Sequence, residues 1–162
     1  MQDYYEPKVG DVAPNFQLPS TRGKDMTLKE HHGKDVILYF YPKDDTPGCT
    51  AEACGFRDKE ADLTKQGAVI LGVSTDPLPS HDKFRDKYKL NFPLLSDQTA
   101  DVAKMYGAWK EKNLSGRRTW GVARMTYWIG GDGRIRKIYK KVDAAKHPEE
   151  ILADIQAARA KK

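Results

Sequence analysis

The sequence predicts a single α/β domain in which helices flank a central mixed β-sheet. Two apolar runs of strand length, residues 36–41 and 68–73, lie on either side of a segment with helical spacing, which is the pattern of a βαβ unit. Two more short strands flank a Gly-Gly-Asp-Gly turn at residues 130–133, which predicts an antiparallel hairpin. Because domains cluster near roughly 100 to 200 residues, we assign residues 1–162 to one domain.

The N-terminal elements follow from short apolar stretches and the turn residues between them. Residues 16–18 and 26–28 are separated by proline, serine and glycine, so they predict a small N-terminal β-hairpin. The run at residues 36–41 is continuous, β-branched and aromatic, which predicts a strand that is buried on both faces. Pro42 then ends this strand.

Four helices are predicted from apolar positions three and four residues apart and from typical end residues. The first covers residues 49–66 and is followed by Gly67, a common residue just past a helix C-terminus. The next two cover residues 80–88, capped by the serine at its start, and residues 100–106. The last covers residues 148–162. It begins with proline and two glutamates and ends with two lysines, so its charges complement the helix dipole.

The cysteine content and the N-terminal sequence indicate where the protein works. The chain has only two cysteines, Cys49 and Cys54, whereas stapled secreted domains are short and cysteine-dense. Residues 1–6 have neither the basic nor the apolar part of a secretory signal, and the longest apolar run is far below the ~20 residues that span a bilayer. We therefore expect a cytoplasmic protein without a membrane partner, whose two neighbouring thiols carry chemistry.

The positive charge is concentrated in one part of the chain. The net charge is +5, but eleven basic and two acidic residues give residues 104–141 a charge of +9, and the remaining residues carry −4. A polarised charge of this kind can steer anions or phosphate backbones, so a nucleic-acid-binding module is one alternative function. A solvated basic face is the simpler interpretation, and we expect no nucleic-acid partner.

The segment with the most chemical information is residues 41–54, which joins the buried strand to the first helix. Such a loop lies beyond the carboxyl end of a strand, where α/β folds place their sites. Cys49 falls in the first turn of the predicted helix, where unpaired backbone N–H groups and the helix dipole favour thiolate over thiol. Thr46 lies three residues earlier and can offer its hydroxyl to the sulfur or to an oxygen that the sulfur attacks.

The spacing of Cys49 and Cys54 has a mechanical consequence. Five residues apart on one regular helix, their Cα atoms are separated by about 8.6 Å, whereas a disulfide needs about 7 Å or less. A disulfide therefore requires local unwinding, which fits a cycle in which Cys49 is oxidised first and Cys54 then condenses with it. Two structural thiols, one of them buried, are the alternative, but the proline and glycine before Cys49 favour the reactive interpretation.

These residues resemble the peroxiredoxin family, and within it the Q-type or bacterioferritin comigratory protein subfamily. Family members share the pattern Pro-x-x-x-Thr-x-x-Cys, which is matched by Pro42, Thr46 and Cys49. Many members of the subfamily carry a second cysteine five residues later, as this chain does. The stretches at residues 10–16 and 124–127 are similar to the family as well. The resemblance covers essentially the whole chain and implies a thioredoxin-like fold.

The resemblance implies catalytic roles for the two cysteines and for the groups around them. Cys49 would be the peroxidatic cysteine, which attacks the O–O bond of a peroxide and becomes a sulfenic acid, and Cys54 would be the resolving cysteine. Fixed donors aimed at the sulfur and at the departing oxygen would stabilise the transition state. The candidate donors are Thr46, the backbone N–H groups around Gly48 and Cys49, and the guanidinium of Arg124.

Three further positions have roles that the resemblance leaves less direct. Pro42 would pack over the pocket and shield the sulfenic acid from water. Glu52 would either orient an arginine or be a plain acid on the helix surface. Position 125 carries Met where relatives commonly have Ser after the arginine, and this larger side chain can alter how Arg124 is held.

The resemblance also implies the substrates and partners of the protein. Hydrogen peroxide and organic hydroperoxides would be reduced, a dithiol donor such as thioredoxin would restore the thiols, and the protein would be a monomer. A thiol–disulfide oxidoreductase on the same fold is the other alternative, but the missing Cys-x-x-Cys motif argues against it. The two cysteines, His31 and His32 do not form a zinc pattern, so we expect neither a metal nor another cofactor.

Overall fold

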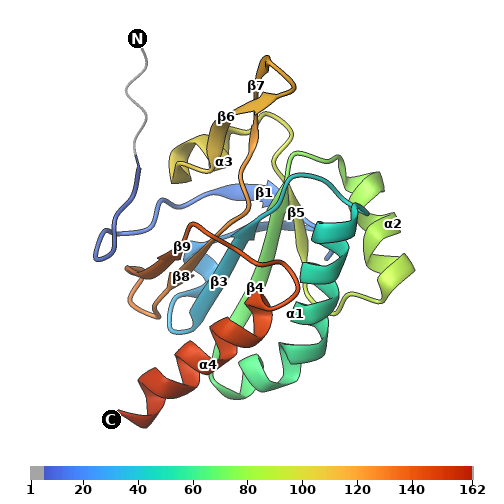
Figure 1. Ribbon diagram of the computed structural model, residues 1–162. Coiled ribbons are helices and arrows are strands. Elements are labelled where there is room, and N and C mark those ends of the chain that lie inside the picture. Colours follow the sequence, from blue (N-terminus) through green and yellow to red (C-terminus); the bar gives the residue numbers. More distant parts are fainter. Residues whose placement is uncertain (1–5, 162) are drawn as a thin grey trace.

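The computed structural model describes residues 6–161 and is built around a five-stranded mixed sheet with helices on both faces (Figure 1). The strands of this sheet are β3 (Asp35–Phe40), β4 (Ala68–Ser74), β5 (Leu94–Ser96), β8 (Met125–Ile129) and β9 (Ile135–Tyr139). Their order from edge to edge is β5-β4-β3-β8-β9. The first three run parallel, whereas β8 is antiparallel to β3 and β9 is antiparallel to β8. The predicted mixed sheet and its C-terminal hairpin are confirmed.

Two smaller hairpins lie outside the central sheet. The predicted N-terminal hairpin is formed by β1 (Gln17–Pro19) and β2 (Asp25–Thr27), and a short 3-10 helix, η1 (Lys29–His31), follows it. The second hairpin, β6 (Trp109–Leu114) and β7 (Arg117–Val122), was not predicted. Its turn is Ser115-Gly116 with φ of 54° and 80°, the left-handed conformation that suits a two-residue hairpin loop.

The helices are α1 (Pro47–Lys65), α2 (Leu78–Tyr88), α3 (Asp101–Tyr106) and α4 (His147–Ala160), all close to their predicted ranges. The α2 helix begins two residues earlier than predicted because Pro79 fits its first turn. Ser80 is therefore not the N-cap, and its hydroxyl donates to Asp44 instead. No helix in residues 6–161 is long and apolar enough to cross a bilayer.

Side chains of β3 alternate between two cores, one on each face of the sheet. Val36, Leu38 and Phe40 pack with the N-terminal hairpin and α3, whereas Ile37 and Tyr39 pack with α1, α2 and α4. All five side chains are at most 2% exposed, which explains why this strand has no polar alternation. Because β3 and β4 are parallel, their C-terminal ends meet at one edge of the sheet, where the loop that leads into α1 begins.

Candidate active site

Cys49 lies in the first turn of α1, just beyond the end of β3, and its side chain is buried. Thr46 is the N-cap in an extended conformation, and Pro47 is the first helical residue. The first hydrogen bond of the helix runs from the N–H of Thr50 to the carbonyl of Thr46, at 2.8 Å. The N–H groups of Gly48 and Cys49 consequently donate to no group in the part of the chain that the structure describes. Two backbone donors are thus available beside the sulfur.

The guanidinium of Arg124 reaches this thiol from the segment between β7 and β8. Its Nη2 donates to the Sγ atom of Cys49 at 3.4 Å, and its Nη1 donates to Oε1 of Glu52 at 2.8 Å. Burial alone would lower the pKa of Arg124, but the negative charges of Glu52 and Cys49 outweigh burial and raise it. Arg124 therefore stays charged and presents a fixed donor to the sulfur.

Glu52 lies beneath this arginine, one helical turn after Cys49. Its side chain is 0% exposed, so it is not an acid of the helix surface. Burial raises the pKa of Glu52 to about 7, although the charge of Arg124 acts in the opposite direction. Its Oε2 atom is buried without a hydrogen-bond partner among the described residues. The geometry thus supports the alternative in which Glu52 orients an arginine.

Gly48 has a steric reason to be glycine. A Cβ atom at this position would lie 3.0 Å from Nη2 of Arg124, which is tighter than an ordinary contact. The missing side chain therefore lets the guanidinium approach the first turn of α1 and the sulfur of Cys49. Of the seven residues predicted for the site, four meet in one place: Cys49, Arg124, Glu52 and Gly48.

Thr46 and Pro42 occupy the loop before the helix, but the structure shows no direct bond from either to Cys49. The Thr46 hydroxyl donates its proton to the carbonyl of Lys43 at 2.8 Å. One expectation was that this hydroxyl donates to the sulfur, and in the structure it does not. Its oxygen can still accept a hydrogen bond. Pro42 is half-buried where the loop begins, and its contact with the site stays a prediction.

Cys54 lies on the same uninterrupted helix as Cys49, and both thiols are free. Cys49 is 1% exposed, whereas Cys54 is half-buried. On a regular helix five residues turn by about 140°, so the two side chains leave α1 on different faces. The structure therefore separates the two cysteines, and a bond between them requires that α1 unwinds.

The methionine after Arg124 does not disturb the site. Met125 is buried in the core cluster on the other face of the sheet, where the hydroxyl of Tyr127 lies 3.9 Å from its sulfur. Successive residues of a strand point to opposite faces, so the larger side chain fills core volume. Arg124 still reaches Cys49, and the departure from the family pattern is accommodated in the core.

A second cation, which was not predicted from the sequence, lies close to the site. The ammonium of Lys112, on β6, donates to the carbonyl of Val122 at 2.7 Å. Burial and the charge of Arg124 lower the pKa of Lys112, whereas the charge of Cys49 opposes them. The position of Lys112 depends on the β6–β7 hairpin, which was not predicted. The only sequence signal for this hairpin is its Ser115-Gly116 turn.

The basic segment at residues 104–141 does not form one free surface. Arg124 and Lys112 point toward the site, and several of its other cations lie within ion-pair distance of carboxylates. These pairs are Lys110 with Glu6, Arg118 with Glu111, and Lys137 with Asp154. This arrangement favours the interpretation of a solvated face together with an anion-stabilising site.

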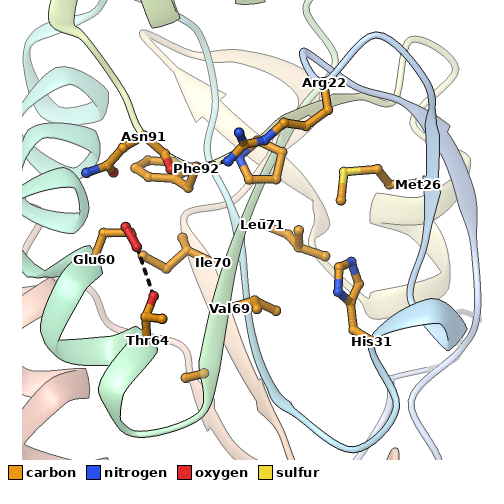
Figure 2. Close-up of a pocket in the computed structure, with 12 residues that line it drawn as sticks. Arg22, Met26, His31, Glu60, Thr64, Val69, Ile70, Leu71, Asn91 and Phe92 are labelled. Atoms are coloured by element: carbon orange, nitrogen blue, oxygen red, sulfur yellow. Dashed lines mark hydrogen bonds between the residues drawn. The ribbon is translucent and has the colours of Figure 1, made fainter.

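A cavity of about 190 Å³ lies at the opposite end of the parallel strands, away from Cys49 (Figure 2). Its wall includes the first half of β4, from Ala68 to Leu71, together with Met26 and Phe92. Figure 2 shows Glu60 and Thr64 of α1 joined by a hydrogen bond at its side. No residue predicted for the site lines this cavity.

An α/β sheet of this topology, with a buried cysteine in the first turn of a helix and an arginine on its sulfur, is the arrangement expected of a thiol peroxidase. The chain belongs to the AhpC/TSA family, whose model matches residues 9–138. It is 46% identical over 145 residues to a putative peroxiredoxin Bcp of Coxiella burnetii, covering 90% of this chain and 96% of that one. It is 40% identical over 145 residues to the peroxiredoxin Bcp of Escherichia coli K12, covering 90% and 93%.

Solved structures agree with these relatives. The bacterioferritin comigratory protein of Xanthomonas campestris, studied for alkyl peroxide reduction, matches with a TM-score of 0.87 at 35% identity, covering 94% of this chain and 97% of that one. A cysteine-to-serine mutant of Xylella fastidiosa PrxQ matches with a TM-score of 0.90 at 33% identity, covering 96% and 99%. The resemblance to peroxiredoxins and the thioredoxin-like fold are thus confirmed, and the protein is a peroxiredoxin enzyme.

Proposed function

We propose that the protein is a two-cysteine peroxiredoxin in which Cys49 attacks the peroxide and Cys54 resolves the product. The observation that carries the proposal is the 3.4 Å contact between the Arg124 guanidinium and the Cys49 sulfur in the first turn of α1. The cation and the free N–H groups of this turn lie where negative charge must be stabilised on a reacting sulfur. Burial of Cys49 and Glu52 keeps bulk water away from these charges, which strengthens their interaction.

The first step transfers one oxygen atom from the peroxide to Cys49. The thiolate attacks the terminal oxygen of ROOH, so an S–O bond forms while the O–O bond breaks, and RO⁻ leaves with the electron pair. The leaving group then takes a proton from solvent. Arg124 and the N–H groups of Gly48 and Cys49 would stabilise the charge as it moves from sulfur to oxygen. The oxygen of Thr46, whose own proton is bonded to the chain, would accept the hydrogen of the peroxide.

The second step forms a disulfide and releases water. The Cys54 thiolate attacks the sulfenic acid of Cys49, the S–O bond breaks, and the departing hydroxide is protonated. Because both residues lie on α1, this step requires that the helix unwinds between them. A dithiol donor of the thioredoxin type would then supply two electrons and restore both thiols.

The remaining assignments complete the proposal. Glu52 would orient Arg124, as their 2.8 Å ion pair suggests, and Pro42 would shield the sulfenic acid from water. Residues 1–162 would form one domain, which is supported by two cores that share a single sheet. The domain would act as a monomer in the cytoplasm on hydrogen peroxide and organic hydroperoxides. The alkyl peroxide work on the Xanthomonas campestris protein supports the second substrate class.

Thiol counting under anaerobic conditions tests the reaction class. One equivalent of hydrogen peroxide should remove both thiols, and mass spectrometry of the 49–54 peptide should show an internal disulfide. Cys49→Ser should abolish turnover, whereas Cys54→Ser should allow one rapid oxidation and then stall at the sulfenic acid. A Cys49→Ser variant with full peroxidase activity would contradict the assignment.

A further inference from the structure

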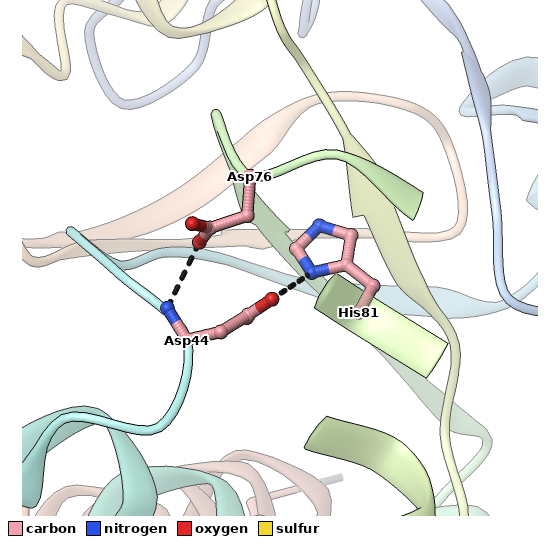
Figure 3. A group of neighbouring side chains, drawn as sticks. All are labelled: Asp44, Asp76 and His81. Carbon is pink, nitrogen blue, oxygen red and sulfur yellow. Dashed lines mark hydrogen bonds and ion pairs between the residues drawn. The ribbon is translucent and has the colours of Figure 1, made fainter. Parts of the chain in front are cut away.

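Asp44, five residues before Cys49, is the most extensively bonded residue of the loop that leads into α1. Figure 3 shows its contacts with Asp76 and His81. Its carboxylate accepts a hydrogen bond from the hydroxyl of Tyr41 at 2.6 Å and another from the hydroxyl of Ser80 at 2.8 Å. The Nδ1 atom of His81 lies 2.7 Å from the same carboxylate. These partners come from the end of β3 and from α2, so the carboxylate joins the loop to both elements.

The surroundings of the two ring nitrogens of His81 show where hydrogens must lie. Nε2 lies 2.9 Å from the carbonyl oxygen of Leu95, which can only accept, so Nε2 must carry a hydrogen. His81 is 0% exposed and Asp44 is buried, so no bulk water shares these bonds. One further proton must lie between Nδ1 and the carboxylate oxygen, because two lone pairs would repel each other at 2.7 Å. The imidazole thus connects β5 to the loop through two hydrogen bonds.

A metal ion does not fit this group. The ligand atoms of Asp44, Asp76 and His81 lie within 4.8 Å of one another, but both ring nitrogens of His81 face oxygens across a hydrogen. Asp76 has a different use, because its carboxylate accepts the backbone N–H of Asp44 at 2.8 Å (Figure 3). The hydroxyl of Ser74 donates to the same oxygen at 2.6 Å. The loop is therefore held by its backbone as well as by a side chain.

We propose that His81 is a positioning residue for peroxide reduction, which acts on Cys49 through Asp44. Only two residues separate Asp44 from the first residue of α1, so the place of Asp44 limits where the helix N-terminus can lie. Thr46 bonds back to the carbonyl of Lys43, the residue before Asp44, and shares the same anchor. The inference rests on the proposed function, because it concerns the alignment of a peroxide between Thr46 and the Cys49 sulfur.

Two substitutions of His81 separate its two hydrogen bonds. The amide nitrogen of asparagine is as many bonds from Cβ as Nδ1 of histidine, and that of glutamine is as many as Nε2. His81→Asn therefore keeps the donor to Asp44 and loses the donor to Leu95, whereas His81→Gln does the opposite. Both remove one bond and a ring, so a purely structural role would make their effects equal.

The measurement is the second-order rate constant for oxidation of Cys49 by hydrogen peroxide in stopped flow, with alkylation by iodoacetamide as a reference reaction. His81→Gln should lower the peroxide rate constant by about 10- to 100-fold, and His81→Asn should keep it within about threefold. Alkylation needs no aligned peroxide, so both variants should keep its rate within about threefold. Equal peroxide rate constants in the two folded variants would overturn the inference, as would parallel losses of peroxide oxidation and alkylation.

A second pair of variants, at Asp44, tests the same inference if His81→Gln fails to fold. Asp44→Asn keeps an oxygen for Tyr41, and its amide nitrogen, in the place of Oδ2, offers one hydrogen to a neutral His81 and one to the oxygen of Ser80. Asp44→Leu has the same branched shape but makes no hydrogen bonds. Only Asp44→Leu should slow peroxide oxidation, and equal rates in the pair overturn the inference. A wild-type Cys49 that does not react with peroxide at all would instead refute the proposed function.

Discussion

The guanidinium of Arg124 joins the sulfur of Cys49 to the carboxylate of Glu52, at 3.4 Å and 2.8 Å. Its two Nη groups lie in one plane and point in different directions. One can therefore donate to a reacting atom while the other donates to a buried carboxyl group that fixes the orientation of the side chain. A lysine ammonium is a point charge on a flexible stem and has no such fork. The site is therefore sensitive to small displacements of Arg124.

Arg124→Lys should lower the rate constant of Cys49 oxidation by about 100-fold, the size of effect seen when one fixed donor to a transition-state charge is lost. Stopped-flow tryptophan fluorescence during the first oxidation measures this rate constant. Arg118→Lys is the control, because Arg118 is an exposed residue of β7 that pairs only with Glu111 among the described residues. Both substitutions keep the positive charge, so a similar loss in both variants would contradict a specific role for the fork of Arg124.

Gly48→Ala should slow peroxide oxidation at least tenfold without lowering stability. The added Cβ would lie 3.0 Å from Nη2 of Arg124 and would push the guanidinium from the sulfur. Alanine is also the better helix former by up to about 1 kcal/mol, so the free energy of unfolding in urea should not fall.

Gly55→Ala is the matched control for this substitution. Its Cβ would lie 2.8 Å from Cγ of Pro148 and would strain the packing of α1 on α4. This variant should therefore lose about 1–3 kcal/mol of stability while its first oxidation stays fast. The opposite pattern, with a fast Gly48→Ala and a slow Gly55→Ala, would contradict the steric role of Gly48.

Glu52→Gln should change how stability depends on pH. Burial raises the pKa of Glu52 from 4.5 to about 7, so the folded state holds its proton in a range where the unfolded state has released it. Stability from this group is complete below pH 4.5 and is lost as the pH rises to about 7. Glu52→Gln should therefore be more stable than wild type at pH 8, by about 3 kcal/mol, and the gain should vanish near pH 4. Urea denaturation at both pH values measures this difference in stability. The same difference at pH 4 and at pH 8 would exclude a Glu52 that titrates between them.

Local patterns sufficed to predict the elements that build the site. The run at β3 is continuous because both of its faces are buried, and Pro47 and Gly48 mark the helix turn that holds Cys49. The β6–β7 hairpin escaped prediction because charged residues occupy its strands and leave no apolar alternation. Lys112 was missed with it.

Contacts between distant residues were the other part that could not be predicted. Asp44 and His81 are 37 residues apart, and Ser80, which looks like an N-cap, belongs to their network. The partner of Arg124 was left open for the same reason, because the burial of Glu52 depends on how α1 packs against the rest of the fold. Short-range spacing predicts which turn a residue occupies, whereas tertiary packing decides what faces it.

Unwinding of α1 should limit the disulfide step, and a glycine between the cysteines should accelerate it. Ala51 is exposed and lies between Cys49 and Cys54, so Ala51→Gly removes no packing and weakens the helix by about 1 kcal/mol. A change of this size raises the population of the unwound segment about fivefold. Disulfide formation after the first oxidation should therefore become about fivefold faster, while the oxidation of Cys49 itself is unchanged.

Ala61→Gly is the matched control, because Ala61 is an exposed residue of the same helix beyond Cys54. It lowers helix propensity equally but lies outside the segment that must open, so disulfide formation should keep its wild-type rate. Stopped-flow fluorescence with two resolved phases separates oxidation from disulfide formation in each variant. Equal acceleration by both substitutions would mean that all of α1 unfolds before the disulfide forms. No acceleration by Ala51→Gly would mean that helix opening is not the slow step, since the distance between the two cysteines is the same in all three proteins.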